Sequence, residues 1–317
     1  MPGTILHRHD FNAGAVAETL KNAMSGFGTD EAAVIFCLGN HTSQQRLEIA
    51  TAYKTAYGKD LQDDIKSELT GDFESACVAL LTPPSKYDAQ QLHEAISGAG
   101  TDETTIVEIL CTKNNDEIVD IKAAYKTEYD TDLEDDLQGD ASGYFRRLLV
   151  SLLAAGRETD EGDVDESRAR EDAQKFFDAG ESRWGTDEAE LNAILCLRSR
   201  QHLNEVFRQY QEIAGSPIEE SIQNECSGAL QEGFLAIVES TKDTPGYFAR
   251  RIKECVQGIG TNDAHLIRII ITRSEIDMEE INEAYIAKYG ISVSEEIENE
   301  CGGDYKKILI ACVKLQD

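Results

Sequence analysis

The sequence predicts an all-α protein built from four homologous repeats of five helices each. Apolar residues recur at intervals of three and four, and no stretch sustains the alternation that is typical of strands. One glycine turn returns four times, at residues 24–31, 98–103, 183–188 and 258–263. Recurrence at a spacing of roughly seventy residues indicates a repeat architecture, with additional chain between the second and third repeats.

In the first repeat, apolar spacing predicts helices over residues 16–24, 29–38, 47–56, 61–69 and 73–81. The first helix is expected to end at the glycine turn, and Thr29 is expected to cap the second. Gly58 marks the end of the third helix. Pro83 and Pro84 must end the fifth, because proline cannot continue a helix. The same order of signals recurs in the other three repeats.

These patterns divide the chain into six segments: a tail over 1–12, repeats over 13–84 and 85–156, a linker over 157–167, and repeats over 168–241 and 242–317. We expect the short tail to be unstructured. The linker is acidic, and its carboxylates could indicate a metal site. It lacks the ligand register of an EF-hand loop, so a solvated hinge is the preferred interpretation.

The formal net charge of −30 excludes the nucleic-acid-binding class, which needs a basic surface to contact phosphates. It also opposes direct docking on an anionic membrane. Binding to such a membrane would need a cation between the two negative surfaces.

The eight cysteines lie mostly within apolar helical patterns and form no CxxC motif, so buried free thiols are favoured over disulfides. Cys37 and His41 are one helical turn apart, but Cys37 stands between apolar neighbours, which favours a core thiol over an enzyme nucleophile. The glycine turns match neither GxGxxG nor a Walker motif. We find no secretory segment and no apolar run of about 18 residues, so we expect a soluble, cytoplasmic protein.

A distant acid accompanies each glycine turn. It stands 40 residues after Gly28, Gly100, Gly185 or Gly260, and another glycine follows it three residues later. The four acids are Glu68, Asp140, Glu225 and Glu300. A connecting loop with a capping acid would explain one such turn. The identical offset in four turns favours a binding site instead.

The chemistry of this pair of features suits calcium, which prefers six to eight oxygen ligands in loose geometry. The last carbonyls of a helix have no partner within the helix, and glycine allows the chain to turn them toward one point. The predicted ligand sets are the carbonyls of Met24, Gly26 and Gly28 with the Glu68 carboxylate, those of Ile96, Gly98 and Gly100 with Asp140, and those of Val256, Gly258 and Gly260 with Glu300.

A site with one carboxylate should bind calcium weakly and leave positions open for a lipid phosphate. Calcium affinity and membrane affinity would then be reciprocally coupled, and several sites would act together. The sequence therefore predicts a calcium-switched membrane binder. The alternative is an acidic helical scaffold that binds basic proteins without calcium.

The repeated turns and acids, together with Leu-Thr-Gly-Asp-Phe-Glu at 69–74 and Ser-Gly-Tyr-Phe at 142–145, closely resemble the annexins over residues 13–316. The resemblance implies a slightly curved disc whose calcium sites meet acidic phospholipids such as phosphatidylserine. It implies a peripheral membrane protein that acts in membrane organisation or trafficking, rather than an enzyme. Trimers or larger assemblies on membranes are a further family expectation, and secretion without a signal peptide is left open as an alternative to the cytoplasm.

The third turn departs from the family pattern, because Arg183 stands where a glycine is usual. The resemblance implies a loop one residue longer, with carbonyls of Gly180, Arg183 and Gly185 beside Glu225. Trp184, the only tryptophan, either packs against neighbouring helices or enters the membrane interface, where indole is favoured. Arg183 is expected to meet a lipid phosphate.

Overall fold

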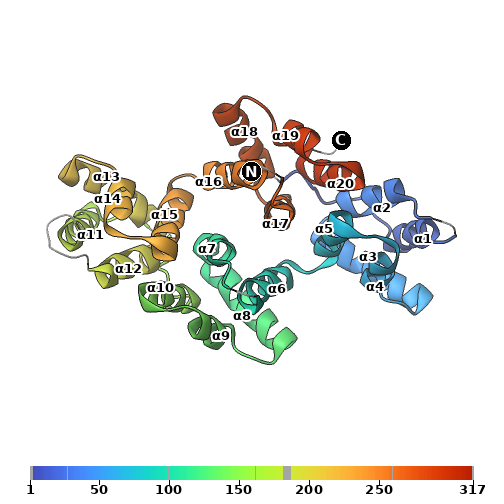
Figure 1. Ribbon diagram of the computed structural model, residues 1–317, viewed down its shortest axis with the longest axis horizontal. Helices are drawn as coiled ribbons and strands as arrows, with labels where there is room; N and C mark the ends of the chain where they lie inside the picture. Colours follow the sequence, from blue (N-terminus) through green and yellow to red (C-terminus); the bar gives the residue numbers. More distant parts are fainter. Residues whose placement is uncertain are drawn as a thin grey trace. The chain divides into compact units, whose positions relative to one another are not determined.

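The computed structural model describes residues 3–26, 28–98, 100–160, 162–180, 187–258 and 260–315. These residues form 20 helices and no strand, which confirms the all-α class and the four repeats of five helices (Figure 1). Within the same ranges, every helix is too short or too polar to cross a lipid bilayer.

Each repeat follows one order of helices, with a long third helix and a short fourth one. The first repeat contains α1 (Ala13–Ala23), α2 (Glu31–Gly39), α3 (Ser43–Tyr57), α4 (Leu61–Glu68) and α5 (Gly71–Leu81). The second contains α6 (Pro84–Ser97), α7 (Glu103–Thr112), α8 (Asn115–Tyr129), α9 (Leu133–Asp140) and α10 (Gly143–Leu153). The third contains α11 (Glu166–Ala179), α12 (Glu188–Leu197), α13 (Arg200–Ala214), α14 (Ile218–Glu225) and α15 (Gly228–Lys242). The fourth contains α16 (Thr244–Val256), α17 (Asp263–Arg273), α18 (Met278–Tyr289), α19 (Val293–Glu300) and α20 (Gly303–Val313).

Local sequence signals explain most helix ends. Gly58 adopts the left-handed conformation that ends α3, and α5 ends two residues before the proline pair. The predicted cap of α2 is wrong. Asp30, not Thr29, accepts a hydrogen bond from the Ala33 amide at 3.0 Å, because a carboxylate is a strong acceptor at a helix N-terminus.

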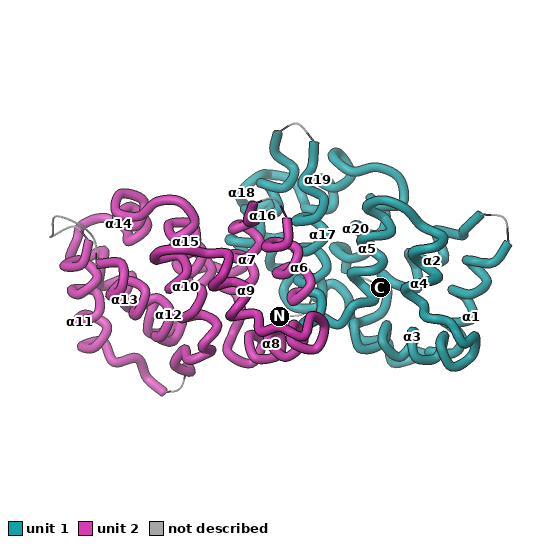
Figure 2. The backbone as a smooth tube through the Cα atoms, turned by 60° about the horizontal axis from the view of Figure 1, so that its bottom comes forward, with its two compact units in different colours: residues 1–87, 245–317 teal, residues 88–244 magenta. Residues whose placement is uncertain are grey.

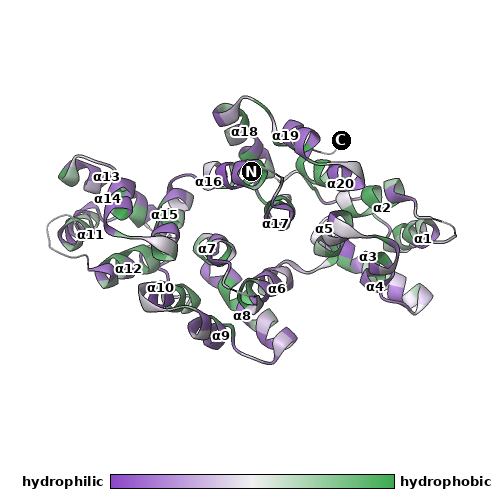
Figure 3. Ribbon diagram, in the orientation of Figure 1, coloured by the Kyte–Doolittle hydropathy of each residue, from purple (hydrophilic) through white to green (hydrophobic). Residues whose placement is uncertain are grey.

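The helices form two compact units, which Figure 2 colours separately: residues 1–87 with 245–317, and residues 88–244. In the first unit, α5 packs against α17 and α20, and α2 packs against α20. In the second unit, α7 packs against α15 and α10 packs against α12. Individual helices carry both hydrophobic and hydrophilic faces (Figure 3), so each unit buries apolar surface between its own helices.

The N-terminal tail is ordered in part, so the prediction of an unstructured tail is wrong. Thr4 and Ile5 are each only 2% exposed, and the Ile5 amide donates to the Ser274 carbonyl at 3.1 Å. The Arg8 backbone exchanges two hydrogen bonds with the side chain of Gln45. These contacts join the tail to helices of the first and fourth repeats within one unit, a pairing that local sequence could not indicate.

The acidic linker also differs from the predicted hinge at its beginning. The Glu158 amide donates to the Leu197 carbonyl at 2.8 Å, and the Gln201 amide donates to Asp160 Oδ1 at 2.9 Å. The Arg157 guanidinium donates to the Arg198 carbonyl at 2.7 Å. Residues 157–160 are therefore fixed to the third repeat, because their polar groups find partners there.

Gly39 lies where α2 and α20 approach closely. A β-carbon added at Gly39 would stand 2.8 Å from Ala311 Cβ, closer than side chains pack. Gly39→Val should therefore lower the free energy of unfolding by about 1–3 kcal/mol through overpacking, measured by chemical denaturation. Gly14→Ala, at an exposed position of α1, is the control and should lose no stability. Equal stability of Gly39→Val and wild type would contradict this account of the contact.

Candidate functional site

The first glycine turn connects the end of α1 to the start of α2. The Asp30 amide donates to the Ala23 carbonyl at 2.9 Å and closes the turn around the residues between them. Gly26 and Gly28 have φ angles of 117° and 88°, a region that favours glycine. The chain therefore reverses within a few residues, immediately beyond the last helical carbonyls.

The same backbone hydrogen bond closes all four turns. The donor amide and acceptor carbonyl are Asp30 and Ala23, Asp102 and Ala95, Asp187 and Ala179, and Asn262 and Cys255, at 2.9, 2.8, 2.9 and 2.7 Å. The donor is seven residues after the acceptor in three turns and eight residues after it in the third. The third turn is thus one residue longer, as its sequence indicates.

The fold brings each of the first two turns against its distant acid. Thr29 Oγ1 donates to Glu68 Oε2 at 3.4 Å, and Thr101 Oγ1 donates to Asp140 Oδ2 at 2.5 Å. Glu68 and Asp140 are the last residues of α4 and α9. This role of the threonine was not predicted, although a threonine follows each of Gly28, Gly100, Gly185 and Gly260.

In the third repeat, the described part of the turn also lies beside its acid. A β-carbon added at Gly180 would stand 3.7 Å from Glu225 Cγ, so the predicted pair are neighbours. Arg183, Trp184 and Gly185 were predicted as ligands or membrane contacts, and they lie outside the described residues.

The fourth turn differs in its side-chain contacts. Thr261 Oγ1 donates to Asp263 Oδ1 at 2.7 Å, within the start of α17, rather than to the distant acid. Thr261 and Glu300 nevertheless line one cavity of about 510 Å³, together with Glu68 of the first repeat. The turn and acid of the fourth repeat therefore face a common space inside the same unit.

The acids beside the turns remain available to a cation. Glu68, Asp140 and Glu300 are exposed, and none forms an ion pair with a basic side chain among the described residues. Asp64, one helical turn before Glu68, instead lies 3.8 Å from Lys21 Nζ and 3.4 Å from Lys59 Nζ. The protein neutralises the acid behind the turn and leaves the acid at the turn unpaired.

The available donors fit calcium better than zinc. In the described ranges, no group of three or more histidine, cysteine, aspartate or glutamate side chains is arranged to hold a metal ion. Each predicted ligand set consists of one carboxylate and the backbone carbonyls at a helix end. Oxygen donors of this kind suit calcium, whereas zinc prefers nitrogen and sulfur.

Cys37 and His41 are not arranged as a nucleophile and its base. All eight are free thiols, and seven are buried, which confirms the prediction of free rather than bridged cysteines. Burial raises the pKa of Cys37 to about 11, which disfavours the reactive thiolate. The His41 ring bonds through Nδ1 to the Cys37 carbonyl at 2.8 Å instead of serving the thiol as a base.

Comparisons with known proteins agree with these observations. The annexin family profile matches residues 15–80, 87–152, 171–237 and 247–312. Annexin A11 of Oryctolagus cuniculus is 47% identical over 308 residues, which cover 97% of this chain and 61% of that protein. The solved structure of annexin III has 40% sequence identity to this chain. The alignment covers 100% of this chain and 98% of the annexin III chain, with a TM-score of 0.96. A structure described as calcium-bound annexin (Sm)1 is 29% identical, with coverage of 99% and 94% and a TM-score of 0.88.

The four profile matches fall one in each predicted repeat, while the residue-level boundaries of the repeats stay predictions. Annexins in general bind calcium and phospholipid and are not enzymes, so the family supports the class of function expected from the turns. The chain spans less than two thirds of the annexin A11 sequence. Profile, sequence identity and fold agree: this chain belongs to the annexin family.

Proposed function

We propose that this protein binds acidic phospholipid membranes reversibly when calcium rises, through its glycine turns and their distant acids. The proposal rests on the contact between each of the first two glycine turns and its distant acid. Residues 39 apart in sequence, Thr29 with Glu68 and Thr101 with Asp140, are joined by hydrogen bonds. These contacts support a site in which one carboxylate and the carbonyls that end a helix would bind the same ion.

The chain's own groups would supply the protein half of each site. In the first repeat, the carbonyls of Met24, Gly26 and Gly28 would bind from one side and the Glu68 carboxylate from the other. Corresponding groups in the other repeats would do the same. Bound calcium would supply the positive charge that links this anionic protein to an anionic lipid phosphate.

Weak individual sites suit a reversible switch. One carboxylate per turn leaves much of the coordination shell to water or lipid oxygen, and low ligand charge keeps calcium affinity low. Lipid and calcium would strengthen each other's binding, because each completes the site for the other. Several turns engaged on one membrane would add avidity and make the response to calcium steep.

The cellular role we infer is a peripheral one in membrane organisation or trafficking, from the cytoplasm. Phosphatidylserine is the expected lipid, since its head group is anionic and abundant in cytoplasmic leaflets. Self-association into trimers or larger assemblies on the membrane would increase the number of turns engaged together.

The experiment uses phosphatidylserine vesicles, a calcium titration and the emission of Trp184, the only tryptophan in the chain. We expect the protein to co-sediment with vesicles as calcium rises, Trp184 emission to shift to the blue, and a chelator to reverse both. A blue shift would follow from transfer of the indole into the membrane interface. Co-sedimentation without the shift would support calcium-dependent membrane binding but would show that Trp184 does not enter the membrane interface.

Failure to bind vesicles at about 1 mM calcium would contradict the proposal, since weak calcium modules are occupied in that range. It would favour the acidic scaffold instead. That alternative predicts calcium-independent binding to basic proteins, weakened by salt because exposed charges are screened.

A further inference from the structure

A polar contact connects three helices at the same place in most repeats, and we call it the helix bridge. Its three members are a residue three positions before the first predicted carbonyl ligand, a tyrosine on the third helix, and the residue 11 positions after that tyrosine. These members are Lys21, Tyr53 and Asp64; His93, Tyr125 and Asp136; Phe177, Tyr210 and Ser221; and Lys253, Tyr285 and Glu296.

In the first repeat, the helix bridge joins the two halves of the predicted calcium site. Tyr53 is 0% exposed, and its hydroxyl donates to Asp64 Oδ2 at 2.7 Å. Lys21 Nζ lies 3.8 Å from the same oxygen. Lys21 stands one turn before the Met24 carbonyl, and Asp64 stands one turn before the Glu68 carboxylate. The contact therefore ties α1 to α4 through α3.

The fourth repeat has the same arrangement with tighter contacts. Tyr285 is 0% exposed, and its hydroxyl donates to Glu296 Oε2 at 2.6 Å. Lys253 Nζ donates to both carboxylate oxygens of Glu296 at 3.1 Å. Lys253 precedes the Val256 carbonyl by three residues, and Glu296 precedes Glu300 by four.

The second repeat keeps the tyrosine and the carboxylate but replaces the lysine by histidine. The Tyr125 hydroxyl donates to Asp136 Oδ2 at 2.8 Å, and His93 Nδ1 lies 3.0 Å from the same hydroxyl. His93 also stacks on Tyr129 at 3.8 Å between ring centroids. The connection from α6 through α8 to α9 is preserved by different chemistry.

The third repeat has no carboxylate at this place. Ser221 stands where the other repeats have Asp64, Asp136 or Glu296, and Phe177 stands in place of the basic residue. The Phe177 ring packs near Tyr210, with centroids 6.3 Å apart. The chain thus contains an internal comparison, with three charged bridges and one that is largely apolar.

We propose that the helix bridge is a positioning device, which holds the acid of repeats 1, 2 and 4 at a set distance from the turn carbonyls and thereby raises calcium affinity. This inference rests on the proposed function. Groups that are already in place before binding lose less conformational freedom when the ligand arrives. By reciprocity, calcium should stabilise the bridged arrangement as much as the bridge favours calcium.

The test replaces the three bridging tyrosines by phenylalanine, in Tyr53→Phe/Tyr125→Phe/Tyr285→Phe, which removes the hydroxyls and keeps the rings. Calcium binding to the full chain is titrated by calorimetry without vesicles. The calcium concentration at half-saturation should be about fivefold higher for this variant than for wild type, which is the lower end of typical couplings between sites. Tyr210→Phe is the matched control and should leave the midpoint unchanged, because Ser221 carries no charge. The thermal midpoint without calcium is recorded for every variant.

A triple variant with a lower thermal midpoint but an unchanged calcium midpoint would overturn the inference, since the bridge would then only stabilise the fold. An equal effect of Tyr210→Phe would overturn it too, because the effect would not depend on the carboxylate. If wild-type protein takes up no calcium without vesicles, the inference is overturned, and if it also fails to bind vesicles in calcium, the proposed function fails as well. That result is distinct from intact wild-type binding with unaffected variants.

Discussion

The triple variant Glu68→Gln/Asp140→Asn/Glu300→Gln is expected to need at least about tenfold more calcium for half-maximal binding to phosphatidylserine vesicles. Each substitution removes the only carboxylate that the predicted site contains and leaves the carbonyl ligands in place. Calcium affinity depends strongly on ligand charge, and the loss should multiply when several turns bind one membrane. Co-sedimentation across a calcium titration measures the effect.

The matched control removes the same charge from the same three helices at exposed positions away from the turns, in Asp63→Asn/Asp135→Asn/Glu298→Gln. Its calcium dependence should match that of wild type. A similar loss in both variants would mean that overall charge, rather than the acids beside the turns, governs binding. Unchanged binding by the first variant would contradict the assignment of these acids as ligands.

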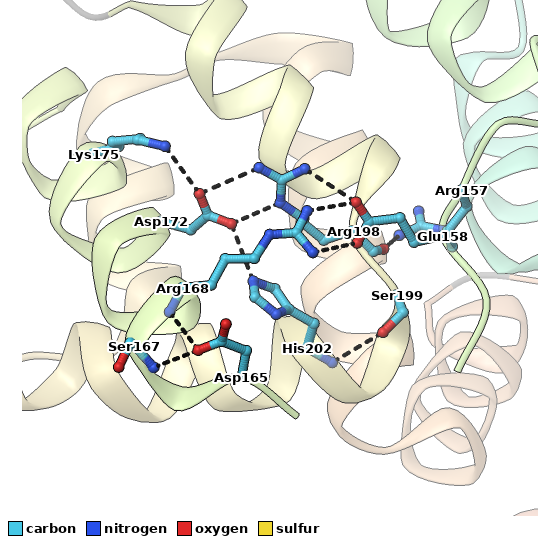
Figure 4. Close-up of polar contacts among 10 residues, drawn as sticks. All are labelled: Arg157, Glu158, Asp165, Ser167, Arg168, Asp172, Lys175, Arg198, Ser199 and His202. Atoms are coloured by element: carbon cyan, nitrogen blue, oxygen red, sulfur yellow. Dashed lines mark hydrogen bonds and ion pairs between the residues drawn. The ribbon is translucent and has the colours of Figure 1, made fainter. Parts of the chain in front are cut away.

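The second large effect concerns a buried polar cluster in the third repeat (Figure 4). The Asp172 carboxylate is 1% exposed and accepts hydrogen bonds from Arg198 Nε at 2.6 Å and His202 Nε2 at 3.0 Å. Asp172→Asn should destabilise the protein by about 3 kcal/mol, because it removes the buried carboxylate that pairs with Arg198 and His202 and leaves Arg198 only the half-exposed Glu158 at 3.3 Å. Calorimetric scans should show the loss as a thermal midpoint lower by roughly 10 °C.

This effect should depend on pH. Burial alone would raise the pKa of Asp172, but hydrogen bonds from Arg198 and His202 outweigh it and lower the pKa to about 2. In an unfolded chain the pKa is about 3.9. A depressed pKa in the folded state stabilises the protein above about pH 4, and this stabilisation is lost as pH falls toward 2.

The difference in stability between wild type and Asp172→Asn should therefore be largest above about pH 5 and shrink as the carboxyl group becomes protonated. Glu171→Gln, the neighbouring exposed acid on α11, is the control and should follow wild type at every pH. A difference that stays constant down to about pH 2 would mean that the charge of Asp172 is not its cause.

Short-range patterns were enough to predict the fold class and the outline of the sites. Apolar residues such as Leu61 and Ile65, four positions apart, require only that one helix face be buried. Gly26 and Gly28 predicted a reversal of the chain because few other residues adopt their backbone angles. The recurring offset of 40 residues predicted that turn and acid belong together, because one repeat architecture carries both to the same place.

Apart from the pairing of turn and acid, contacts between distant segments were not predicted, because each segment has a large number of possible partners. The chain has 60 acidic residues. The residues around Asp64 in the sequence do not indicate its hydrogen bond with Tyr53, and those around Glu68 do not indicate that it lacks a basic partner among the described residues. The packing of Ile5 beside Ser274 joins residues 269 apart in sequence. Choosing among so many pairs requires the positions of whole helices.

The sequence by itself determined the helices, the four repeats and the places of the glycine turns, because helical periodicity and backbone angles are local properties of the chain. The tertiary structure alone decided which carboxylates are neutralised by basic side chains. Asp172 is paired with a guanidinium 26 residues away, whereas Glu68 accepts a hydrogen bond from the hydroxyl of Thr29. Charge pairing depends on distances of a few ångströms between helices, and only their packing sets those distances.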